Sequence, residues 1–151
     1  MLTFARLLVA TGLCGAICSC LTNYPVLQVT TVGSVQGGVL FNLSDLYHEH
    51  PAGFEVTHVE VMELQKSDST LIYEVRGHET VRSITYGRHY PGLTPVHYPG
   101  VKIQSPDTLQ RNRTYTVTID ISTGGTAVAA FRVDDSGAVR QIDWGRAMLR
   151  Q

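Results

Sequence analysis

The stretch of sequence that decides the fold is Thr114-Tyr115-Thr116-Val117-Thr118-Ile119-Asp120-Ile121. Its large apolar residues stand at every second position, and threonine or aspartate fills the positions between them. Successive side chains of a β-strand point to opposite faces of the sheet. The alternation therefore predicts a strand with one face packed on a core and the other face in water.

The same alternation continues on both sides of this strand. It resumes at residues 127–133 after Thr123-Gly124-Gly125, whose glycines accept the positive φ angles of a tight hairpin. Asp134-Asp135-Ser136-Gly137 has the composition of a turn and precedes residues 139–142, which predicts a second hairpin. A third hairpin is predicted upstream, with strands at residues 56–64 and 71–75 joined by Lys66-Ser67-Asp68-Ser69.

Further short strands are predicted at residues 26–32, 38–43, 83–86 and 101–104. Short strands separated by glycine and proline, without a long helical periodicity between them, are typical of a sandwich of Greek-key type. We therefore expect an all-β, immunoglobulin-like antiparallel β-sandwich in one domain, residues 26–151. Two short helical turns are also expected, one at Ser44-Asp45-Leu46 and one within residues 144–150 that docks Trp144 or Leu149 on the sandwich.

The first residues predict an export signal. Arg6 precedes an apolar run at residues 7–17, and these 11 residues are too few to cross a hydrocarbon core of about 30 Å as a helix. The run ends in Ile17-Cys18-Ser19-Cys20, which resembles the bacterial lipobox, with a branched aliphatic residue three positions before a cysteine and a small residue directly before it. This resemblance implies a lipoprotein signal peptide at residues 1–19, acylation of Cys20 and a tether at residues 20–25.

Acylation of Cys20 would anchor the protein to a membrane without a spanning helix, because more than one acyl chain gives stable anchoring. Leu21 stands where an aspartate would resemble a signal for retention in the inner membrane. We therefore expect the periplasmic leaflet of the outer membrane. The alternative is an ordinary cleaved signal that releases a free periplasmic protein.

The cysteines and the charge exclude several classes of function. Cys14, Cys18 and Cys20 all lie in or at the end of the predicted signal, so the mature domain has no thiol for a disulfide, a zinc site or a nucleophile. Removal of Arg6 leaves 11 of the 12 basic residues against 13 acidic residues, a net charge of −2. Nucleic acids require a basic surface, so no nucleic-acid partner is expected.

The histidines are the remaining candidates for chemistry. His48-Glu49-His50 would place two imidazoles on one side of an extended segment, but the sequence identifies no further metal ligand. A solvated loop before Pro51 is the preferred interpretation. The sequence also has no Gly-x-Ser-x-Gly, His-Glu-x-x-His or phosphate-binding glycine loop. We therefore predict no enzyme activity, no bound metal and no cofactor.

One loop carries a doubled motif. His89-Tyr90-Pro91-Gly92 recurs eight residues later as His97-Tyr98-Pro99-Gly100, and proline followed by glycine suits the central positions of a type II turn. A preorganised loop with aromatic side chains suits the recognition of a protein. The alternative is that the turns only route the chain and the tyrosines pack flat on the edge of the core. The predicted contact residues are Arg88, His89, Tyr90, His97 and Tyr98.

Three short motifs in the central part of the chain accompany the lipobox. They are Leu71-Ile72-Tyr73-Glu74-Val75, then Ile84-Thr85-Tyr86-Gly87 followed by Pro91, and Arg113-Thr114-Tyr115-Thr116-Val117. Together they resemble type VI secretion immunity lipoproteins of the bacterial periplasm, although a tryptophan is more typical at the position of Tyr73. The resemblance implies a lipid-anchored binding protein that neutralises a secreted toxin by covering its active site.

Two other functions stay open. An envelope-assembly lipoprotein would use the same fold as a structural adaptor. A periplasmic module for a small ligand or a metal would need a pocket with convergent polar groups. It would be favoured if His48, His50 and a carboxylate met in space.

Overall fold

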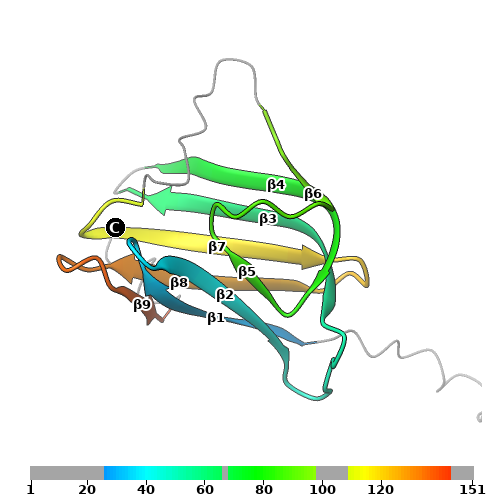
Figure 1. The fold of residues 1–151 in the computed structure, drawn as a ribbon. Helices are drawn as coiled ribbons and strands as arrows, with labels where there is room; N and C mark the ends of the chain where they lie inside the picture. Colours follow the sequence, from blue (N-terminus) through cyan, green and yellow to red (C-terminus); the bar gives the residue numbers. More distant parts are fainter. Residues whose placement is uncertain (1–25, 66–67, 98–108, 144–151) are drawn as a thin grey trace, which may run out of the picture.

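The computed structural model describes residues 26–65, 68–97 and 109–143, which form two antiparallel sheets packed face to face (Figure 1). The smaller sheet has three strands in the order β1-β2-β5. Its members are β1 (Leu27–Ser34), β2 (Gly38–Asp45) and β5 (Ser83–Thr85).

The larger sheet has six strands in the order β6-β4-β3-β7-β8-β9. The predicted antiparallel β-sandwich is therefore confirmed. An immunoglobulin constant domain divides its strands four and three, whereas the described residues divide theirs three and six. The members of the larger sheet are β3 (Phe54–Leu64), β4 (Ser69–Val81), β6 (Leu93–Pro95), β7 (Arg113–Ile121), β8 (Thr126–Val133) and β9 (Val139–Ile142).

The core lies between the two sheets and is built from the alternation that the sequence shows. Tyr115, Val117 and Ile119 of β7 are fully buried. Phe41 of β2 meets Phe131 of β8 across the core, with 5.8 Å between the ring centroids. Because side chains from both sheets interdigitate there, this layer supplies the main apolar burial of the domain.

One side of the sandwich is joined by backbone contacts between the sheets. Ser34 forms an isolated β-bridge with Ala138, and the Val35 N–H donates to the Gly137 carbonyl at 2.9 Å. The Gln141 side chain extends the joint, because its Oε1 accepts from the Thr31 N–H at 2.9 Å. The first strand and the last hairpin therefore hold the two sheets together.

The hairpin predictions are confirmed. Gly124 has φ of 86° in the turn between β7 and β8, and its N–H donates to the Ile121 carbonyl at 3.0 Å. In the turn between β8 and β9, Asp134 Oδ1 accepts from the N–H of Ser136 and from the N–H of Ala138, both at 3.0 Å. Strands β3 and β4 also pair antiparallel, as the third hairpin requires.

Two local predictions are wrong. Ser44 and Asp45 end strand β2 and do not start a helical turn, because the Asp45 side chain instead accepts the Tyr47 N–H at 3.0 Å and bends the chain. The segment after β5 is more than a loop, since it contributes strand β6 to the edge of the larger sheet. Outside the described residues lie the predicted signal peptide, Cys20 and its tether, the strand at 101–104, Tyr98 and the helix within 144–150.

Candidate functional site

The segment predicted to bind a partner lies between the edges of the two sheets, where it leaves β5 and enters β6 (Figure 1). Arg88, His89 and His97 are exposed. Tyr90 is half-buried and packs against the core. The structure therefore brings three of the five predicted contact residues to the surface and uses the fourth, Tyr90, as a support.

The support from Tyr90 makes the segment rigid. Its hydroxyl accepts the Thr85 N–H at 2.8 Å, its carbonyl accepts the Leu93 N–H at 3.0 Å, and the Arg88 guanidinium lies 5.8 Å from its ring centroid. The predicted turn at Pro91-Gly92 is present, but the type II assignment is wrong, because Gly92 does not have a positive φ.

Close backbone approach explains the glycine at position 92. A Cβ there would meet the His78 carbonyl oxygen at 1.8 Å. The Gly92 carbonyl accepts the His78 N–H at 2.8 Å, and the Gly92 N–H donates to Glu79 Oε2 at 2.6 Å. Glycine is therefore required by the contact with β4, which fixes where the segment begins to pair.

A groove of about 330 Å³ lies beside this segment. Arg88 lines it together with Gln36 of the β1–β2 turn, while Tyr86 and Leu109 supply apolar lining. The β1–β2 turn is at the Ser34 end of β1, so the groove is at the opposite end of the sandwich from Leu27. Eight residues of strand separate the two ends by about 25 Å.

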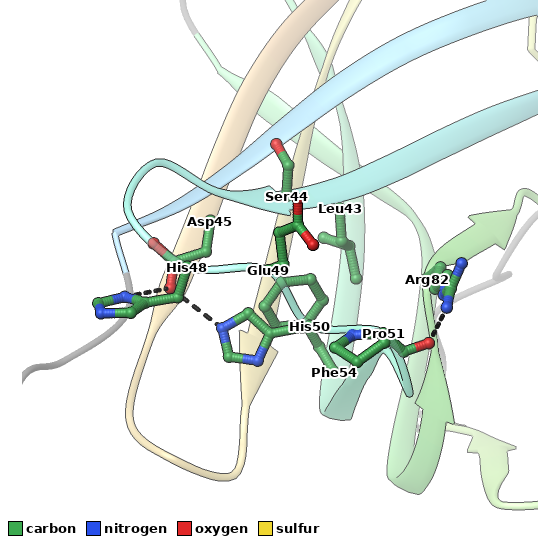
Figure 2. Close-up of a pocket in the computed structure, with 9 residues that line it drawn as sticks. All are labelled: Leu43, Ser44, Asp45, His48, Glu49, His50, Pro51, Phe54 and Arg82. Atoms are coloured by element: carbon green, nitrogen blue, oxygen red, sulfur yellow. Dashed lines mark hydrogen bonds and ion pairs between the residues drawn. The ribbon is translucent and has the colours of Figure 1, made fainter.

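The β2–β3 connection forms a second candidate site, an open hollow of about 380 Å³ (Figure 2). Asp45 Oδ2 lies 3.1 Å from His50 Nε2 and 3.6 Å from His48 Nδ1, so both imidazoles turn toward one carboxylate. His50 also packs on the ring of Phe54, with 4.5 Å between centroids. The Arg82 guanidinium closes another side by donating to the Pro51 carbonyl.

The Asp45 carboxylate organises this connection. The Tyr47 N–H above all, and then the two imidazoles, hold the pKa of Asp45 below its usual value of 3.8. Its side chain is 1% exposed, whereas Leu46 and Tyr47 project into solvent with 53% and 73% of their surfaces exposed. The predicted solvated loop is therefore only partly correct, since a buried carboxylate gives it a defined shape.

A third cluster occupies the outer face of the larger sheet. His58 Nδ1 lies 3.0 Å from Asp120 Oδ2, and His58 Nε2 lies 3.1 Å from Glu74 Oε1. Arg76 Nε donates to the same Glu74 oxygen at 2.7 Å. Burial acts to raise the pKa of Asp120, but hydrogen bonds from Thr126 and His58 outweigh it and the pKa is lowered.

Sequence reasoning missed this third cluster. The available signal is the polar face of the predicted strand at 56–64, where His58 and Glu60 stand two positions apart. The pairing of β3 with β4 sets Glu60 directly opposite Glu74. The hairpin was predicted, but a bulge between Val56 and His58 shifts the register, and the sequence alone does not reveal that shift.

Comparison of the chain with protein-family models, with curated proteins and with solved structures gave no match. Within residues 26–65, 68–97 and 109–143, no helix has the length and apolar character needed to span a bilayer.

Proposed function

We propose that this protein is a lipid-anchored periplasmic immunity protein that neutralises a secreted toxin by direct contact through segment 88–97. The observation that carries the proposal is that contacts on the core side hold this segment in one conformation. Tyr90 holds it by its hydroxyl and its ring, while Arg88, His89 and His97 remain exposed. A preorganised surface loses little conformational entropy on binding, and arginine is a frequent anchor at the centre of interfaces.

The position of the segment suits a tethered protein. Cys20 lies six residues before Val26, so the tether reaches at most about 21 Å from the Leu27 end of the sandwich. The groove beside Arg88 is at the other end. A protein anchored through Cys20 would therefore present this groove away from the membrane surface, where a toxin in the periplasm can reach it.

The test is survival of the native host in competition. A strain that lacks this gene is grown with its parent, whose type VI secretion apparatus is active. The deletion strain should be killed, and wild-type protein supplied in trans should restore survival. The double variant Arg88→Glu, His89→Glu should reach the same level in the envelope and fail to protect. Survival of the deletion strain would exclude the immunity function.

A matched variant separates the contact surface from general effects of added charge. His48→Glu places a charge on the other exposed histidine loop and should protect like the wild type. Cys20→Ser removes the proposed acylation site and should leave the protein in the soluble periplasmic fraction. If the Arg88, His89 variant protects fully, segment 88–97 is not the contact surface.

One observation favours a second function, the binding of a small ligand in the hollow at the β2–β3 connection. Asp45 meets His48 and His50 in space, which is the arrangement that such a module requires. The hollow has an apolar wall from Phe54 and a cationic one from Arg82. A small polar ligand would suit it, and thermal shift measurements with and without Arg82→Ala would test this.

A further inference from the structure

The charged cluster on the outer face of the larger sheet has the arrangement of a metal site. His58 and Glu60 alternate along β3 with buried Val59 and Val61, so both point away from the core. Glu74 stands opposite Glu60 on β4. One donor atom from each of His58, Glu60 and Glu74 lies within 4.8 Å of the others, the one such set of three found among the described residues.

The contacts of the imidazole fit a metal ligand. A metal-bound histidine commonly donates its second ring N–H to a carboxylate, which fixes its tautomer and orientation. His58 Nδ1 has this partner in Asp120 at 3.0 Å, and Asp120 is itself held by the Thr126 hydroxyl at 2.6 Å. The other ring nitrogen, Nε2, lies 3.1 Å from Glu74 Oε1.

The cluster also places like charges side by side. The two glutamates stand directly opposite on paired strands, where like charges are destabilising. A cation bound among the three groups would offset this repulsion.

The charge balance indicates the valence of the ion. Three carboxylates, those of Glu60, Glu74 and Asp120, surround the imidazole, and one guanidinium, that of Arg76, accompanies them. The carboxylates outnumber the guanidinium, and a divalent cation would offset this excess of negative charge.

We propose that His58, Glu60 and Glu74 bind a zinc ion and that Asp120 positions His58. Zinc accepts imidazole and carboxylate ligands at about 2.0–2.2 Å in a tetrahedron, so neighbouring donor atoms lie about 3.3 Å apart. The His58 to Glu74 separation of 3.1 Å is already close to that value. Three protein ligands leave a fourth position for water.

The test is calorimetric titration of zinc chloride into the full chain, purified in detergent and stripped of metal with a chelator. We expect one zinc ion per chain. Glu60→Gln is the sharpest variant, because the Glu60 carboxylate has no hydrogen bond or ion pair among the described residues. This change removes a ligand without breaking a contact of the fold and should abolish binding. Asp120→Asn should weaken binding by about 10- to 100-fold.

The matched control is the double variant His48→Ala, His50→Ala, which removes the other pair of histidines and should bind zinc like the wild type. Cobalt offers a second readout, because its visible absorption in the wild type should disappear in Glu60→Gln. Thermal unfolding of each variant verifies that it is folded. The proposal is overturned if the wild type binds no zinc in excess metal, if Glu60→Gln binds as tightly, or if the control loses the site.

Discussion

Two clusters of histidine and carboxylate in this protein are built in opposite ways. In the loop cluster, Asp45, His48 and His50 come from one short stretch of chain. In the sheet cluster, His58 contacts Glu74 at a separation of 16 residues and Asp120 at a separation of 62. The loop cluster is visible in the sequence and local in structure, whereas strand pairing alone creates the sheet cluster.

The difference teaches what a short motif can determine. His48-Glu49-His50 keeps two imidazoles near each other, but their direction depends on Asp45, which bends the chain by accepting the Tyr47 N–H. In the sheet cluster the pleat and the register set both distance and direction. We therefore expect the sheet cluster to contribute to the stability of the whole domain and the loop cluster to affect its own surroundings.

The largest effect should follow from Glu74→Ala. The Glu74 side chain is 1% exposed and contacts both His58 and Arg76. Its removal should lower the free energy of unfolding by about 3 kcal/mol, because His58 and Arg76 lose the buried carboxylate that they contact. Denaturant unfolding measures the loss. Asp45→Ala is the comparison and should cost less; equal losses would show that the two clusters do not differ in this way.

An intermediate effect should appear at low pH in the loop cluster. Because the folded-state pKa of Asp45 is lowered, its ionised form stabilises the fold above about pH 3.8, and this contribution is lost as the pH falls through the folded pKa. The free energy of unfolding should therefore fall less in Asp45→Asn than in the wild type between about pH 5 and about pH 2. Identical pH profiles would remove Asp45 as a source of the acid sensitivity.

The smallest effect should come from the double variant His48→Ala, His50→Ala. His48 is 57% exposed, and exposed ion pairs contribute little to stability. The midpoint of denaturant unfolding should stay within experimental error, while amide exchange at Tyr47 should become faster, because the imidazoles no longer help hold Asp45. A clear shift in the midpoint would mean that the loop cluster supports the core after all.

The fold was largely predictable because alternation and turn composition are local signals. The strands around Tyr115 and Phe131, and the turns at Gly124 and Asp134, follow directly from them. Strand β6 was missed because three residues, one of them Pro95, show no alternation, and its pairing with β4 depends on the close approach of Gly92 to His78. Such a contact is set by the tertiary structure.

The candidate sites were less predictable for a related reason. Exposure of Arg88 and His89 follows from their loop, but the burial of Tyr90 depends on where Thr85 and the core lie. The sequence places Glu74 within a predicted strand, but its contact with His58 depends on the bulged register of β3 with β4, and the contact of His58 with Asp120 joins residues 62 positions apart. Sequence patterns indicate which residues are exposed. Which side chains meet in space depends on the register of the paired strands.

The bridge between Ser34 and Ala138, with the Gln141 side chain beside it, joins the two sheets along one margin of the sandwich. At the opposite margin the chain crosses between the sheets at Arg82, which joins β4 to β5, and in the segment that carries Arg88, which joins β5 to β6 without strand pairing between the sheets among the described residues. Local opening of the sandwich should therefore begin at the margin that carries this segment. A partner that binds the segment would hold the two sheets together at this margin and slow unfolding of the entire domain.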